Sequence, residues 1–236
     1  MENLKKLSRQ ELFNKLCHFD FIKRSHKNEE LIRKVYNLIC QLHKDEPDRL
    51  DGPYINHLLR VAIICLEFGA NDINIIVAAL LHRSAEDQAD KLNKQMVSFA
   101  SSNDPIRTGA LIEIGNMFGS VVEQYVTGLT NPDLTCTPEG KDKQKVYIKH
   151  VDELVKNDPK ASLIKLADFY DKALPLTEIK DSKLRRLLCE RYKSIFEIFI
   201  SALSNKKIAF LDVKKTQKIL KDLRNGYTFV KQELKK

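Results

Sequence analysis

Three residues have the types and settings that could bind a metal ion. His57 lies one turn into an amphipathic segment, His82 ends the apolar segment 73–82, and Asp168 closes the apolar run 163–168. Buried imidazoles and carboxylates need partners, because moving them out of water is costly. Two imidazoles and one carboxylate suit Mn, Fe or Zn better than Mg or Ca. We therefore expect the tips of these side chains to meet within about 5–6 Å, as shared metal ligation requires.

The segments that would position these residues are predicted to be helical. Only eight Gly and seven Pro interrupt the chain, and no stretch alternates apolar and polar residues as a strand does. Pro53 suits the first turn of a helix that ends near residue 68, where Gly69 suits its C-cap. Asp72 suits the N-cap of the apolar helix 73–82. We expect an all-α fold, with further helices over residues 109–117, 119–128, 142–156, 160–174, 183–204 and 212–224.

Composition favours a folded protein without a membrane span. Apolar residues make up 43% and charged residues 31% of the 236 residues. No apolar run approaches the ~18 residues of a transmembrane helix, and the N-terminus lacks the apolar region of a secretory signal. The five cysteines are scattered and never form a CxxC pair, so we expect no disulfide framework and a reducing, cytoplasmic location.

Positive charge is concentrated at the C-terminal end. Residues 206–236 hold ten Lys or Arg and three acids, and so carry seven of the eight net positive charges. We expect one domain over residues 1–205 and a basic helical extension over 206–236. The extension is either a solvated helix with its lysines outside or a patch for polyanions such as RNA, and it suggests nucleic acid only weakly. The sequence makes no prediction of oligomeric state.

Four ordered stretches carry a family resemblance. They are residues 51–62 (Asp-Gly-Pro-Tyr-Ile-Asn-His-Leu-Leu-Arg-Val-Ala), 78–87 (Ala-Ala-Leu-Leu-His-Arg-Ser-Ala-Glu-Asp), 118–130 (with Phe-Gly-Ser-Val-Val and Val-Thr-Gly-Leu-Thr) and 165–168 (Lys-Leu-Ala-Asp). In this order they resemble the HD-type hydrolase domain of RelA/SpoT-like proteins, over about residues 28–200. The resemblance implies an all-α HD bundle and a small stand-alone hydrolase of guanosine bis(diphosphate), (p)ppGpp.

The resemblance also implies residue roles. His57, His82 and Asp168 would hold Mn²⁺, and a metal-bound water would remove the 3′-pyrophosphate. Glu86 and Asp87 would orient or deprotonate this water, or protonate the leaving oxygen. Glu86 is four residues after His82, so a continuing helical turn would place both on one face. Some members of the family cleave other nucleotide phosphates, such as NADPH, so the substrate does not follow from the fold.

The sequence departs from the family at its metal and nucleotide positions. The family's His-Asp doublet reads His82-Arg83 here, and the lost Asp is a metal ligand in the family. A guanidinium about 5 Å from a divalent ion costs roughly 6–7 kcal/mol at an effective dielectric of about 20. Lys172 and Pro175 replace the family's nucleotide-contacting Asn and a usual Thr. The basic pair that holds guanine in the family is only approximated by His43 and Lys44.

A longer connection also follows the two acids. The family usually has a shorter connection here, so residues from about 90 to 108 form an insertion relative to the family. It is either a tolerated surface insertion or a lid or partner-binding element over the pocket.

Two functions therefore stay open. One is a metal-dependent phosphohydrolase of (p)ppGpp or a related nucleotide, with Lys44 and Lys172 as substrate-binding residues. The other is a metal-free pseudoenzyme of the same fold that binds a nucleotide or a protein partner. In the second case Arg83 would take the place of the metal and pair with Asp168, Glu86 or Asp87.

Overall fold

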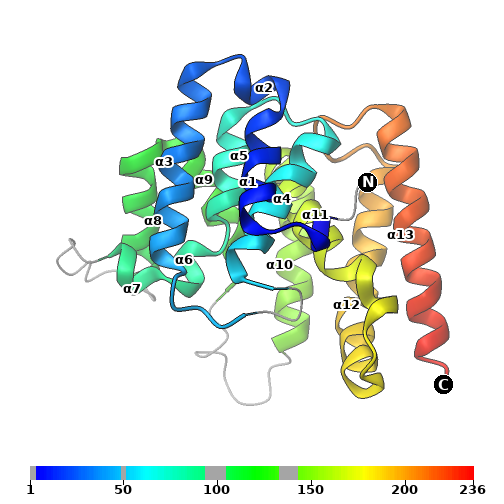
Figure 1. Cartoon of the computed structure of the whole chain (residues 1–236). Coiled ribbons are helices and arrows are strands. Elements are labelled where there is room, and N and C mark those ends of the chain that lie inside the picture. The colour runs from blue at the N-terminus through cyan, green and yellow to red at the C-terminus, as the bar shows by residue number, and fades with distance from the viewer. Residues whose placement is uncertain (1–3, 49–51, 94–104, 133–142) are drawn as a thin grey trace. The chain divides into compact units, whose positions relative to one another are not determined.

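The computed structural model describes residues 4–48, 52–93, 105–132 and 143–236 (Figure 1). Over these ranges the chain is helical and contains no β-strand, so the predicted all-α fold is confirmed. The chain divides into two compact units, Met1–Thr130 and Asn131–Lys236. This division differs from the functional domains expected over 1–205 and 206–236, which stay a prediction.

Short and long helices follow one another in both units. In the first unit the described helices are η1 (a 3-10 helix, Leu4–Lys6), α1 (Arg9–His18), α2 (Asp20–Lys23), α3 (His26–Leu42), α4 (Tyr54–Phe68), α5 (Ile73–Leu81), α6 (Ser84–Asp87), α7 (Ala89–Leu92), α8 (Pro105–Phe118) and α9 (Ser120–Leu129). In the second unit they are α10 (Lys143–Asn157), α11 (Pro159–Ala173), the 3-10 helix η2 (Leu174–Glu178), α12 (Ser182–Ser204) and α13 (Val213–Glu233).

Helix α5 forms the centre of the first unit, as its apolar sequence predicts. All its residues from Ile75 to Leu81 are buried, and it packs against α3, α4 and α9. The capping residues are those expected from the sequence. Gly69 closes α4 with a φ of 111°, which a residue with a Cβ rarely adopts. The Asp72 carboxylate accepts a hydrogen bond of 3.0 Å from the backbone N–H of Asn74.

The predicted helix 73–82 ends within one residue of the observed end, and the turn that would have continued it to Glu86 does not form. Helix α5 ends at Leu81, and α6 begins at Ser84 with its own hydrogen bonds from Glu86 and Asp87 N–H to Arg83 O. The ring Nδ1 of His82 lies 2.7 Å from Ala79 O, the carbonyl that would accept from the backbone N–H of Arg83 in a continuing helix. The side chain thus competes with the backbone at the helix end.

In the second unit α13 packs along α12, and α10 packs against α11 and α12. Helix α13 extends to Glu233, well past its predicted end at residue 224. Gly226 lies just past that predicted end, and in the structure it serves packing. A Cβ on Gly226 would lie 3.0 Å from the ring of Phe196 on α12, so its absence lets the two helices approach.

Parts of two predicted segments lie outside the described residues. Within 90–108 the structure describes the end of α7 and the start of α8, while residues 94–104 are outside it. Most of the predicted loop 131–140 is outside it as well. Among the helices that are described, none is both long enough and apolar enough to cross a membrane.

Candidate functional site

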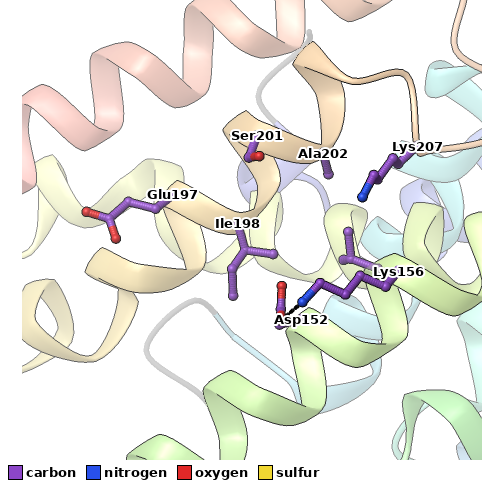
Figure 2. A pocket seen from close by; sticks show the side chains of 8 residues that line it. Asp152, Lys156, Glu197, Ile198, Ser201, Ala202 and Lys207 are labelled. Carbon is purple, nitrogen blue, oxygen red and sulfur yellow. Dashed lines mark hydrogen bonds and ion pairs between the residues drawn. The ribbon is translucent and has the colours of Figure 1, made fainter.

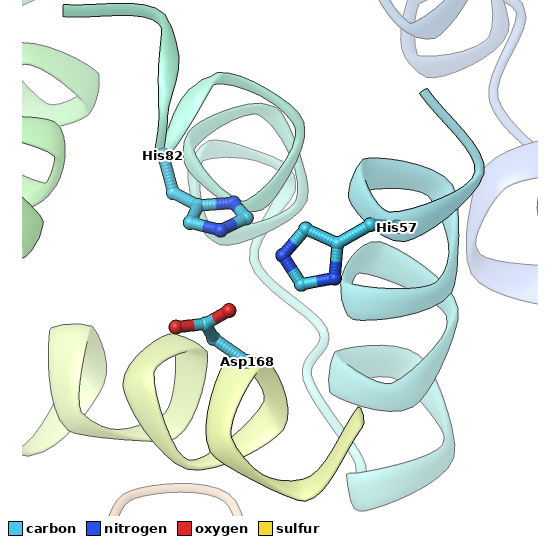
Figure 3. A group of neighbouring side chains, drawn as sticks. All are labelled: His57, His82 and Asp168. Atoms are coloured by element: carbon cyan, nitrogen blue, oxygen red, sulfur yellow. The ribbon is translucent and has the colours of Figure 1, made fainter. Parts of the chain in front are cut away.

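The first unit brings His57 and His82 together in its core. His57 on α4 is 0% exposed and His82, at the end of α5, is 3% exposed. Their ring centroids are 5.3 Å apart and the ring planes are inclined by 71°, an edge-to-face arrangement that Figure 3 shows. The contact of His82 Nδ1 with Ala79 O makes Nδ1 the donor, which places the ring's lone pair on Nε2. Imidazoles that bind metals are commonly oriented in this way.

Arg83 pairs with both candidate catalytic acids. Its Nη1 lies 2.6 Å from Glu86 Oε2, and its Nη2 lies 3.0 Å from Asp87 Oδ1. The Glu86 side chain is 8% exposed and the other two are 23–24% exposed, so water screens these ion pairs little. The predicted pairing of Arg83 with these acids is confirmed. Both carboxylates thus have a fixed cation beside them.

Tyr54 joins this network, which sequence reasoning missed. Its hydroxyl donates to Asp87 and accepts a hydrogen bond of 3.2 Å from Arg83 Nε. The buried ring of His43 stacks on Tyr54 with centroids 5.0 Å apart, and His43 Nε2 lies 3.3 Å from Ser84 Oγ. Tyr54 lies 29 residues before Arg83. The two residues meet because the start of α4 lies near the turn between α5 and α6. No local sequence spacing predicts this contact.

Burial and the ion pairs shift the pKa values in this network. Burial alone would raise the pKa of Asp87, but the Arg83 charge and hydrogen bonds from Tyr54 and Arg83 outweigh it and the pKa is lowered. Burial raises the pKa of Tyr54, so its hydroxyl stays protonated. Burial lowers the pKa of His43, although the charges of Glu46 and Asp87 oppose this. Asp87 is therefore ionised and a weak base, and His43 favours its neutral form.

The second unit holds the remaining predicted ligand, Asp168. It lies on α11, is 5% exposed, and forms an ion pair of 2.6 Å with Lys172 Nζ one turn later (α11 carries Asp168 in Figure 3). Asp168 and Lys172 are thus together in one unit, and His57, His82, Glu86 and Asp87 in the other. That all of them form one site stays a prediction.

The other predicted nucleotide contact, Lys44, is exposed in the turn after α3. Pro175, which departs from the resembled family, lies in η2. The second unit also has a cavity of about 270 Å³ between α10 and α12 (Figure 2). Its lining includes an Asp152–Lys156 ion pair. None of the predicted site residues lines it.

Comparison with known proteins places the chain beside enzymes of guanosine polyphosphate metabolism. No family model matches the chain. A protein named probable GTP pyrophosphokinase from Mycobacterium leprae is 30% identical over 145 residues, which are 60% of this chain and 15% of that protein. A GTP pyrophosphokinase of Streptomyces antibioticus is 31% identical over 58% of this chain and 14% of its own length. These similarities support the RelA/SpoT resemblance.

One relative is named for hydrolysis. Guanosine-3′,5′-bis(diphosphate) 3′-pyrophosphohydrolase of Aquifex aeolicus is 26% identical over 164 residues, which are 70% of this chain and 20% of that protein. The chain thus spans a fifth or less of the length of these relatives. The names of these relatives include both GTP pyrophosphokinase and 3′-pyrophosphohydrolase.

Proposed function

We propose that this chain is a nucleotide-binding domain of the RelA/SpoT hydrolase type in which fixed cations take over the charge-balancing role of a metal. Its ligand is guanosine 3′,5′-bis(diphosphate) or a related nucleotide. The observation that carries the proposal is the pairing of Arg83 with both Glu86 and Asp87.

The paired acids are poorly suited to general-base catalysis. A base must accept a proton from water, and its pKa should lie near the working pH. The pKa of Asp87 is instead held low, and the Glu86 carboxylate lies 2.6 Å from a guanidinium that never releases its proton. Protonating Asp87 would weaken the charge-assisted hydrogen bonds that it accepts from Arg83. The arrangement therefore supports ligand binding more than water activation.

The predicted metal donors favour metal binding, whereas the positive charges near them oppose it. His57, His82 and Asp168 are donors that fit Mn, Fe or Zn, and such an ion would activate water when bound. Yet Asp168 already has the Lys172 ammonium 2.6 Å away, and Arg83 replaces the family's remaining ligand. Two fixed positive charges beside a proposed ligand set reduce its affinity for a divalent cation. We therefore propose weak metal binding and derive no reaction step from a metal.

Two lysines suit a phosphorylated ligand, because Lys offers a compact positive charge to phosphate oxygens. We propose that Lys172 and the exposed Lys44 face the phosphates, while Arg83 stays paired with Glu86 and Asp87. The names of the relatives add the guanosine bis(diphosphate) class of ligand.

Calorimetric titration with guanosine 3′,5′-bis(diphosphate) in EDTA tests this proposal. We expect binding that persists without metal and weakens at least tenfold in Lys172→Gln, with GTP binding less tightly because it lacks the 3′-pyrophosphate. Absence of binding in EDTA, with binding restored by Mn²⁺, would contradict the proposal.

A second candidate is the Mn²⁺-dependent 3′-pyrophosphohydrolase itself. The buried His57–His82 pair favours it, because the His82 ring is oriented as a metal ligand would be. Elemental analysis of the purified chain and an assay of pyrophosphate release with Mn²⁺ separate the two. A stoichiometric transition metal together with Mn²⁺-dependent release would establish the hydrolase and overturn the metal-free proposal.

A further inference from the structure

The exposed side of α13 carries only positive and neutral residues. Its buried residues include Ile219, Leu223 and Val230, in the helix that packs along α12. Apart from Val213 at its start, its exposed residues are either basic or neutral and polar. The basic ones, called the basic face below, are Lys214, Lys218, Lys221, Arg224 and Lys231, and the neutral ones are Gln217, Asn225, Thr228 and Gln232.

The acids of the same segment are engaged elsewhere. Asp212 accepts a hydrogen bond of 2.7 Å from the backbone N–H of Lys215 as the N-cap of α13. Asp222 accepts 2.5 Å from the hydroxyl of Tyr170 on α11, and Glu233 pairs with Arg185 of α12 at 2.8 Å. None of these three acids forms an ion pair with a residue of the basic face.

The basic face also works against the stability of its own helix. Lys214, Lys218, Lys221 and Arg224 follow one another at spacings of three or four residues. Like charges at these spacings repel each other and destabilise a helix. In the part of the chain that the structure describes, these four cations form no ion pair. A helix that is merely solvated usually intersperses acids on its outer side, so this arrangement indicates an anionic partner.

We propose that the basic face of α13 binds the phosphate backbone of a nucleic acid. From Lys214 to Lys231 the face extends about 26 Å along the helix at 1.5 Å per residue. Lys and Arg neutralise phosphates, and exposed neutral amides such as those of Gln217 and Gln232 can donate to phosphate oxygens.

Other anionic partners fit this face less well. A helix that lies on an anionic membrane buries an apolar face in the lipid, whereas the buried residues of α13 belong to a helix packed on α12. A protein interface needs apolar or aromatic anchors near its centre, and the exposed residues between Lys214 and Gln232 include none. Backbone contacts carry no sequence information, so we expect binding that depends on salt and not on sequence. This proposal does not depend on the proposed function.

Fluorescence anisotropy with a labelled DNA duplex of mixed sequence tests the proposal. If all five cations contact phosphates, the logarithm of the affinity should fall against the logarithm of salt concentration with a slope of about −4.5. The fourfold variant Lys214→Gln, Lys218→Gln, Lys221→Gln and Arg224→Gln should reduce this slope by about 3.6 and abolish binding near physiological salt. Glutamine is a good helix former, and thermal unfolding by circular dichroism checks that the variant keeps its fold.

A control variant removes the same charge from other exposed positions. It carries glutamine at Lys6, Lys27, Lys180 and Lys193. We expect it to bind the duplex with nearly the slope of the parent chain. Equal loss of binding in both variants would show a general effect of net charge and overturn the proposal. So would a parent chain that sediments with phosphatidylserine vesicles but does not bind the duplex at low salt.

Discussion

Arg83 Nη1 lies 2.6 Å from Glu86 Oε2, in a setting where the glutamate side chain is only 8% exposed. The same guanidinium reaches Asp87, so one cation holds both candidate catalytic acids. The resemblance noted in the sequence implies a metal-binding acid at the position of Arg83. The exchange therefore reverses the sign of a charge at the residue following His82.

Removing the guanidinium should destabilise the fold. Arg83→Gln leaves two partly buried carboxylates without their cation, and we expect a loss of about 2–3 kcal/mol in the free energy of unfolding. Urea denaturation measures this loss. Arg24→Gln is the matched control, because Arg24 pairs with Asp20 where both side chains are more than half exposed. It should cost less than about 0.5 kcal/mol of stability. A similar loss in both variants would argue against a stabilising, partly buried pairing of Arg83 with the two acids.

The ion pair of the second unit should behave in the same way. Lys172→Gln removes the ammonium beside the buried Asp168, and we expect it to cost about 1–2 kcal/mol of stability. Chemical denaturation measures this loss. Lys156→Gln, which breaks the more exposed pair with Asp152, should cost less. An equal loss of stability in the two variants would contradict a buried pairing of Lys172 with Asp168.

The hydroxyl of Tyr54 should contribute to stability through its hydrogen bonds with Arg83 and Asp87. Tyr54→Phe removes one donor to Asp87 and one acceptor for Arg83 while keeping the ring that stacks on His43. We expect a loss of about 1 kcal/mol, and much less of it in an Arg83→Gln background. Additive losses in this double-mutant cycle would show that the two residues act independently.

Stability should also depend on the protonation of His43. Its pKa is lowered by burial and by Lys91, against the charges of Glu46 and Asp87. The unfolded chain then takes up the proton at higher pH, near about 6.5. Stability is therefore complete above about 6.5 and falls as pH drops towards the lower pKa of the folded state. Unfolding measured across this range should show a smaller slope for His43→Gln, and an identical slope would contradict the assignment.

The sequence predicted elements whose signals are local. The apolar run before His82 predicts a central helix, and Asp72 and Gly69 predict the boundaries on its N-terminal side. The predicted helix 73–82 also ends within one residue of the end of α5. The end of α13 differs more, because the helix was expected to end at residue 224 and continues through Gly226 to Glu233. The role of Gly226 is to admit Phe196 of another helix, and sequence spacing does not reveal that neighbour.

The candidate site was predictable in its residue types but not in its hydrogen-bond network. The pairing of Arg83 with nearby acids follows from spacings of three and four residues. The bridging role of Tyr54 and the stacking of His43 on it depend on packing between distant segments. Lys172 was predicted as a nucleotide contact. Its ion pair with Asp168, four residues earlier, was not predicted, although the same helical spacing indicates it.

The most direct test of the central claim is a calorimetric titration of the parent chain and of Arg83→Asp with Mn²⁺. The substitution removes a fixed cation and restores a carboxylate at the position of the family's metal ligand. We expect negligible Mn²⁺ binding by the parent chain and an affinity at least a hundredfold higher for Arg83→Asp, with Arg24→Asp behaving like the parent. Equal, tight binding of Mn²⁺ by the parent and Arg83→Asp would show that Arg83 does not replace the metal, and would contradict the account.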